Sequence, residues 1–217
     1  MDTKLFILDE RVSIANQFLF ELRDNNLQKD RMRFRRNLER LGELLAYELS
    51  RKLPFQSKTV TTPLGDLSMQ LPRELPLLIT ILRAGIPFHQ GFLNVFDGAD
   101  CGFIGAFRNE EESAVTVQAD YTSLPAVSGK QVILIDPMLA TGKSVLEAQK
   151  LILSKGKPAH LYIVLVVAAP EGIKMLTENL TLPFSLWTCA VDEKLNAAFY
   201  IVPGLGDAGD LSYGVRV

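Results

Sequence analysis

Cysteine, histidine and tryptophan are scarce in this chain. Its 217 residues include two cysteines, two histidines and one tryptophan. Cys101 and Cys189 lie far apart and form neither a CxxC pair nor a metal-ligand spacing, so they predict no metal site and favour a reducing, cytoplasmic compartment. His89 falls in an expected helix and His160 at an expected strand start, and we interpret both as surface or packing residues rather than catalysts.

Neither sign of charge dominates, and no apolar run is long. Lys plus Arg number 23 and Asp plus Glu 25, a net charge of −2, so the protein is not built to coat nucleic acid or a membrane through bulk charge. A membrane-spanning helix needs ~20 apolar residues, whereas the longest apolar run covers only residues 161–169. The N-terminus lacks the basic-then-apolar pattern of a signal peptide.

The overall amino-acid composition is that of an ordinary globular protein. Hydrophobic residues make up 47% and charged residues 22%, a composition that excludes a mainly disordered chain. The length predicts a single domain over residues 1–217. Within it we expect N-terminal helices and a hairpin over residues 1–70, with the helices in residues 11–52 and the hairpin in residues 57–70.

Basic residues concentrate in the expected N-terminal helices. Six of them lie between positions 29 and 40: Lys29, Arg31, Arg33, Arg35, Arg36 and Arg40. One interpretation is a solvated helix face that Asp30, Glu39 and Glu43 partly balance. The other is a contact surface for phosphate, a nucleotide or RNA.

From residue 77 onward, strands and helices alternate. Buried-strand patterns cover residues 77–82, 102–107, 131–136, 161–169 and 184–191. This alternation predicts an α/β fold, a parallel sheet with helices on both faces. Ligands bind beyond the carboxyl ends of such strands, which places Arg83, Arg108 and residues 136–144 and 168–171 on one rim. The polar segment 108–121, which lies between the second and third of these strands, shows no clear core pattern.

The strongest local motif covers residues 136–144, Asp-Pro-Met-Leu-Ala-Thr-Gly-Lys-Ser. A hydrophobic strand ends in an acid, and a short turn with hydroxyl side chains leads into a helix. Backbone N–H groups at a helix start form an anion site, and the acid can accept hydrogen bonds from ribose hydroxyls. The alternative is an ordinary turn in which Thr141 or Ser144 only caps the helix.

Two other motifs resemble nucleotide-binding sequences but do not fit them. Residues 142–144 look like the end of a phosphate-binding Walker A loop, but the first glycine of that loop would fall on Pro137. Residues 204–209 spell G-x-G-x-x-G, yet too little chain follows for a dinucleotide-binding βαβ unit.

The chain resembles the uracil phosphoribosyltransferase family across nearly its whole length. The resemblance is carried by residues 81–85, 108–111, 136–142, 167–173 and 200–210. The last segment, Tyr-Ile-Val-Pro-Gly-Leu-Gly-Asp-Ala-Gly-Asp, is highly specific. The resemblance implies a type I phosphoribosyltransferase fold with a C-terminal hood loop. It also implies the reaction of uracil with phosphoribosyl diphosphate (PRPP), which gives UMP and diphosphate and uses Mg²⁺ bound mainly through PRPP.

The resemblance also implies roles for particular residues. The PRPP loop would comprise Asp136, Pro137, Met138, Leu139, Ala140, Thr141, Gly142, Lys143 and Ser144, with Asp136 near the ribose hydroxyls. Arg83, and Arg108 at the base of a mobile flap, would contact the diphosphate. Uracil would meet Ile201, Gly206, Asp207 and Ala208, largely through backbone groups, and Asp207 would also face PRPP and its magnesium. The catalytic set is therefore Arg83, Arg108, Asp136 and Asp207, and no metal ligand is assigned within the chain.

The partners expected are uracil and PRPP as substrates and further copies of the chain in a homo-oligomer, with no membrane and no nucleic acid. Leu and Phe residues of the helices in residues 11–52 offer apolar surface for such an interface. The alternative function is a regulatory paralogue that binds PRPP or a nucleotide with weak or no transferase activity, and that binds RNA through residues 29–40. Lys143 stands where this family usually has glycine, and it could point outward, bind the phosphate, or sit at a strained positive φ.

Overall fold

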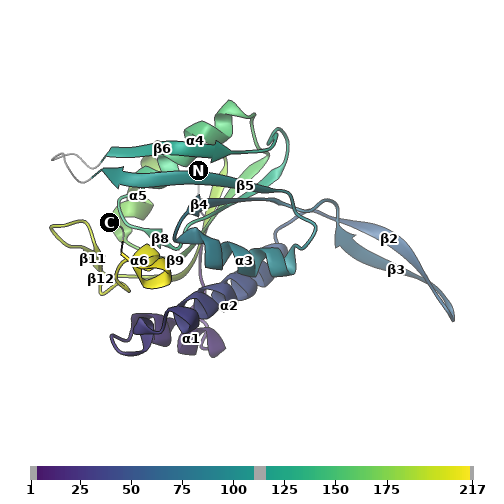
Figure 1. The fold of residues 1–217 in the computed structure, drawn as a ribbon. Helices are drawn as coiled ribbons and strands as arrows, with labels where there is room; N and C mark the ends of the chain where they lie inside the picture. The colour runs from purple at the N-terminus through teal and green to yellow at the C-terminus, as the bar shows by residue number, and fades with distance from the viewer. Residues whose placement is uncertain (1–3, 110–115, 216–217) are drawn as a thin grey trace.

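The computed structural model describes residues 4–109 and 116–215. In that part of the chain eight strands form one sheet in the order β1–β10–β9–β7–β4–β5–β6, with the short β8 beside β9 (Figure 1). The strands are β1 (Lys4–Ile7), β4 (Leu77–Leu82), β5 (Cys101–Asn109), β6 (Thr116–Ser123), β7 (Gln131–Ile135), β8 (Met138–Leu139), β9 (His160–Ala168) and β10 (Phe184–Val191). All pair in parallel except β6, which runs antiparallel to β5. The expected α/β fold is confirmed, and β1, β6 and β8 are additions that the sequence did not predict.

Helices cover both faces of this sheet (Figure 1). One face packs against α1 (Ile14–Arg23), α2 (Arg31–Ser50) and α3 (Gly85–Val95), and the other against α4 (Lys143–Ser154) and α5 (Pro170–Asn179). Successive strand residues alternate between the two cores, as in β7, where Ile133 and Ile135 join the first and Val132 and Leu134 the second. Strands buried on both faces read as continuous apolar runs, which is why they were visible in the sequence.

The expected N-terminal helical region is interrupted between α1 and α2. Asp24 Oδ1 accepts hydrogen bonds from the N–H groups of Asn26 (2.9 Å) and Leu27 (3.0 Å), and the short 3₁₀ helix η1 (Leu27–Lys29) follows. An aspartate that bonds the backbone two and three residues on favours a turn over a continuing helix. Asp30 then caps α2 by accepting from the N–H of Arg33.

The basic stretch 29–40 is largely engaged within the chain. Arg33 pairs with Glu21 (3.0 Å) and Arg36 with Glu39 (2.6 Å). Arg35 donates to the carbonyl of Ser212, and Arg40 donates to Asn37 Oδ1 and lies over the ring of Phe18. These contacts favour the interpretation of a helix face balanced by its neighbours.

The expected hairpin is confirmed and projects away from the body of the molecule (Figure 1). β2 (Phe55–Thr62) and β3 (Gly65–Pro72) pair antiparallel as a separate two-stranded sheet. Every residue of β2, and every residue of β3 but the half-buried Pro72, is exposed.

The C-terminal segment forms the expected hood. We use this name for residues 194–210, which include β11 (Lys194–Leu195), β12 (Ile201–Val202) and the start of α6 (Ala208–Tyr213). β11 and β12 pair antiparallel, outside the main sheet. The glycine-rich residues 204–209 therefore lie outside any βαβ unit, which confirms that they are no dinucleotide fingerprint.

We predict that Gly91→Ala destabilises the fold. An added Cβ at Gly91 in α3 would meet backbone atoms of α2, among them the N of Glu43 at 2.7 Å and Cα of Gly42 at 2.8 Å. Backbone cannot rotate away, so the two helices must separate, and we expect a loss of about 1–3 kcal/mol of unfolding free energy. Urea denaturation measures it. Gly98→Ala, whose Cβ would approach only a Leu75 side-chain atom at 3.2 Å, is the control, and equal midpoints for the two variants would contradict the prediction.

Candidate functional site

The site begins where the order of strands reverses. β4 pairs with β7, and from this pair the sheet continues to β5 on one side and to β9 on the other. Both strands are parallel, so their carboxyl ends reach the same edge of the sheet. Arg83 follows β4 directly and Asp136 follows β7 directly. Such a switch point opens a crevice in an α/β sheet and is the usual place for a ligand.

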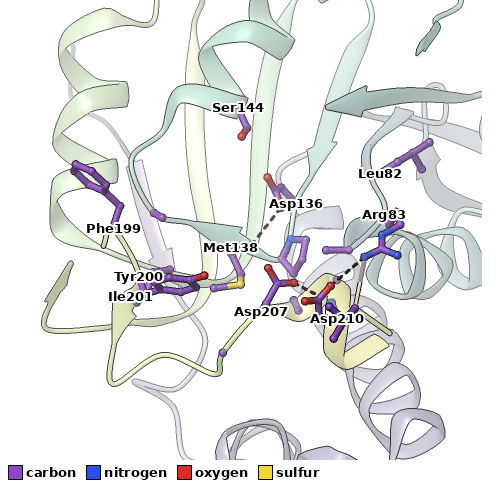
Figure 2. A pocket seen from close by; sticks show the side chains of 17 residues that line it. Leu82, Arg83, Asp136, Met138, Ser144, Phe199, Tyr200, Ile201, Asp207 and Asp210 are labelled. Atoms are coloured by element: carbon purple, nitrogen blue, oxygen red, sulfur yellow. Dashed lines mark hydrogen bonds and ion pairs between the residues drawn. The ribbon is translucent and has the colours of Figure 1, made fainter. Parts of the chain in front are cut away.

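A cavity of about 530 Å³ opens at this edge (Figure 2). Ten residues that the sequence singled out line it: Arg83, Asp136, Pro137, Met138, Ala140, Ser144, Ile201, Gly206, Asp207 and Ala208. Leu139, Thr141 and Gly142 line a small adjoining recess. The structure thus brings together two segments of chain about sixty residues apart, the loop 136–144 and the hood.

The loop 136–144 is fastened to the end of β9. The carbonyl of Pro137 accepts from the N–H groups of Val166 (2.9 Å) and Val167 (3.0 Å), and β8 pairs with β9 in parallel. The N–H of Ala169 donates to the carbonyl of Leu139 (2.9 Å). This anchoring holds the first turn of α4 at the cavity, where backbone N–H groups without an intrahelical acceptor can bind an anion.

Gly142 and Lys143 form the junction between this loop and α4. Gly142 has φ +82°, in the left-handed region that favours glycine. Lys143 is already the first residue of α4 and has no positive φ, so the strained conformation considered for it is not adopted. Its side chain lines neither the cavity nor the recess.

Arg83 presents a guanidinium to the cavity from the end of β4. Its Nη2 donates to Asp210 Oδ1 (3.1 Å) (Figure 2). The same Nη2 donates to the carbonyl of Gly214 (3.2 Å). Its Nε is buried and has no hydrogen-bond partner among the described residues. A buried donor without an acceptor costs free energy, and an anion in the cavity is one way to supply that acceptor.

The hood contributes Asp207 to the same cavity. Its Oδ1 accepts from the N–H of Asp210 (2.9 Å) and so caps α6. Asp136 lies across the cavity, where its Oδ1 accepts from the N–H of Met138 (3.3 Å). The cavity therefore carries carboxylates on two sides and a guanidinium, a set suited to a ligand with both phosphate and hydroxyl groups.

Several lining residues were not predicted from the sequence: Leu82, Ala84, Phe199, Tyr200, Gly209, Asp210 and Val215. Tyr200 and Asp210 lie inside the matched segment 200–210, which was the available signal for them. Phe199 and Val215 lie outside it, and only the folded chain brings them to the cavity.

Arg108 lies in β5 opposite Val117 of β6. Its side chain and residues 110–115 of the expected flap lie outside what the structure describes. The rest of that polar segment forms the β5–β6 pair, where the sequence had predicted no second strand. An antiparallel edge strand with one face toward solvent needs no continuous apolar run.

Neither histidine lines the cavity. His89 is buried in α3, and burial lowers its pKa. His160 Nε2 lies 3.0 Å from Ser185 Oγ. Both positions agree with their interpretation as packing or surface residues.

Comparison with known proteins agrees with this geometry. The sequence model described as uracil phosphoribosyltransferase matches residues 12–215. A uracil phosphoribosyltransferase of Porphyromonas gingivalis is 43% identical over 206 residues, which cover 94% of this chain and 95% of that protein. One from Sulfolobus acidocaldarius is 37% identical over 221 residues, covering 97% and 99% of the two chains. The solved structure of the AQ2163 protein from Aquifex aeolicus superposes with a TM-score of 0.87 at 34% identity, over 98% of this chain and 99% of that one.

Proposed function

The chain belongs to the uracil phosphoribosyltransferase family, and from that premise we infer that it transfers the phosphoribosyl group of PRPP to uracil, giving UMP and diphosphate in pyrimidine salvage. One observation carries the inference for this chain. A single cavity is lined both by the loop that resembles a PRPP site and by the hood that resembles a uracil site, so both substrates can meet there.

For PRPP we propose the following arrangement. Backbone N–H groups of residues 140–144 hold the 5′-phosphate at the start of α4. Asp136 accepts hydrogen bonds from the ribose hydroxyls, and Arg83 binds the diphosphate, with its partnerless Nε as supporting observation. Arg108 completes the diphosphate contacts from β5.

For uracil we propose a site read mainly by backbone. Ile201, Gly206, Asp207 and Ala208 line the cavity from the hood. α6 begins at Ala208, so the N–H groups of Ala208 and Gly209 have no intrahelical acceptor, whereas that of Asp210 is capped by Asp207. Fixed N–H donors match the carbonyl oxygens of uracil.

The transfer requires that the two substrates be oriented and the developing charges stabilised, and it does not require a nucleophilic side chain. A bond forms between N1 of uracil and the anomeric carbon, the bond from that carbon to diphosphate breaks, and the N1 proton is released. Positive charge develops on the ribose while negative charge accumulates on the leaving diphosphate. Arg83 and Arg108 stabilise the leaving group, and carboxylates of the cavity stabilise the ribose. Closure over the cavity would exclude water, which otherwise hydrolyses PRPP.

The donor set of the cavity also fits a magnesium ion carried by PRPP. Mg²⁺ keeps several waters and binds one or two carboxylates together with substrate phosphates. Within residues 4–109 and 116–215, no group of three or more His, Cys, Asp or Glu side chains forms a metal cage, while Asp207 faces the cavity. We propose that Asp207 holds the ion jointly with the diphosphate, whose charge the ion neutralises.

We further propose that a second copy of the chain covers the hairpin. Val60 lies opposite Leu67, and Met69 and Leu71 follow on the same face of β3. These four exposed side chains form an apolar stripe, and an isolated two-stranded hairpin is marginal in water. The helices over residues 11–52, which suggested an interface from the sequence, instead bury most of their Leu and Phe residues in this chain's own core.

The compartment we propose is the cytoplasm. Cys101 and Cys189 are both free thiols. Among the described residues, no helix is long and apolar enough to cross a membrane. No observation favours the regulatory alternative. Of the basic residues it would use, Arg33, Arg35, Arg36 and Arg40 are engaged within the chain.

The base choice tests the function. With PRPP and Mg²⁺, we expect UMP from uracil and a rate with cytosine lower by ~10⁴-fold, because the cytosine amino group would face backbone donors. Chromatographic detection of UMP and CMP measures both. Absence of UMP would overturn the proposed function, and comparable rates with the two bases would overturn the backbone-read site.

A second prediction from the proposed function concerns Asp136. Asp136→Asn keeps the shape but removes the charge, so hydrogen bonds to the ribose hydroxyls weaken. We expect a loss of about 1.5–3 kcal/mol in transition-state stabilisation, measured as kcat/KM, with unchanged thermal unfolding. Asp100→Asn is the control, because Asp100 pairs with Lys130 on the surface and does not line the cavity. Equal kcat/KM values for the two variants would contradict the role given to Asp136.

A third prediction from the proposed function concerns assembly. Leu67→Glu combined with Met69→Glu places two charges on the apolar stripe, and we expect it to shift the oligomer to monomer in sedimentation velocity. Ser68→Glu combined with Gln70→Glu adds the same charge to the opposite face of β3 and should leave the oligomer intact. A wild-type monomer, or dissociation by both pairs alike, would refute this interface.

A further inference from the structure

One ion pair holds both backbone polar groups of Gly204 in the hood. Asp192 accepts two hydrogen bonds from Arg23, Nη2 to Oδ1 at 2.7 Å and Nη1 to Oδ2 at 2.9 Å. The same Oδ2 accepts from the N–H of Gly204 at 2.8 Å, and Arg23 Nη1 donates to the carbonyl of Gly204 at 2.9 Å. The arrangement is a closed clamp of four charge-assisted hydrogen bonds.

The clamped residue is a turn that shapes the uracil side of the cavity. Gly204 has φ +65° and lies between Ile201 and Gly206, which both line the cavity. Its backbone approaches Ile201 so closely that an added Cβ would clash with the Ile201 carbonyl. Fixing Gly204 therefore fixes the turn from which the proposed backbone donors extend.

The clamp itself is anchored to the body of the protein. Arg23 is the last residue of α1, and Asp192 follows β10 and donates its N–H to the carbonyl of Ala168 at 2.8 Å. The Asp192 side chain is only 4% exposed. Neither residue lines the cavity, so neither is placed to touch a substrate.

We propose that Arg23 and Asp192 are positioning residues for uracil, which set the hood at the distance and angle that base recognition needs. This inference rests on the proposed function. Asp192 is buried and Arg23 is partly exposed. An ion pair that takes charge out of water contributes little net stability compared with apolar packing, so stability alone does not account for a charged pair here. A fork of fixed donors and acceptors specifies the position of one peptide unit, which apolar contacts do not.

Two kinetic constants separate positioning from general stability. For Arg23→Gln and Asp192→Asn we expect the KM for uracil to rise about tenfold, while the KM for PRPP stays within about twofold. Arg23→Lys keeps the charge but cannot form the fork, so it should fall between wild type and Arg23→Gln. A loss of structure alone would lower the active fraction without raising the uracil KM selectively.

Arg33→Gln is the matched control. Arg33 also forms an ion pair that involves α1, with Glu21 at 3.0 Å, but among the described residues it has no hydrogen bond or ion pair with the hood. We expect both KM values of this variant to stay within about twofold of wild type.

Hydrogen–deuterium exchange of the peptide covering residues 201–208 tests the clamp without reference to activity. We expect faster exchange in Arg23→Gln than in wild type or Arg33→Gln. Unchanged exchange in Arg23→Gln overturns the clamp, and so does an equal rise of the two KM values. If wild type makes no UMP but the hood still exchanges faster in Arg23→Gln than in wild type, the clamp is supported while the proposed function fails.

Discussion

The pairing of β4 with β7 is the constraint on which the site depends. Because the chain places β5 and β9 on opposite sides of this pair, the connections after β4 and β7 leave the sheet in different directions and open a crevice. The apolar strands that create it are buried on both faces, so the crevice has a rigid floor. Arg83 and Asp136 both reach this crevice because each is the residue directly after its strand.

The cavity presents charged and polar groups in fixed positions rather than a reactive side chain. The loop 136–144 is tied to β9 through the carbonyls of Pro137 and Leu139, so its amides are aimed before any ligand arrives. Arg83 is held by Asp210 through Nη2, and its buried Nε has no hydrogen-bond partner among the described residues. Preorganised groups of this kind avoid a reorganisation cost during reaction, and they suit a transfer in which a large anion leaves.

The hood differs from the loop in how it is held. It follows the last strand of the sheet and pairs only with itself through β11 and β12, so sheet hydrogen bonds cannot position it. Glu171 of α5 accepts from the N–H of Leu195. This hydrogen bond, together with one from the backbone of Glu171 itself, lowers the pKa of Glu171. Together with the Arg23–Asp192 pair, this contact connects the hood to helices on both faces of the sheet.

The sequence by itself determined the elements whose signals are local. Double burial made β4, β7, β9 and β10 readable as apolar runs, and the turn chemistry of residues 136–144 marked the loop. Tertiary structure decided what depends on the path of the chain. The pairing of β1 with β10, the contact of Arg83 with Asp210 and the bond of Arg23 to Asp192 across 169 residues leave no periodic pattern. An ion pair or an edge strand forms only when folding brings its two sides together, so neither side alone predicts it.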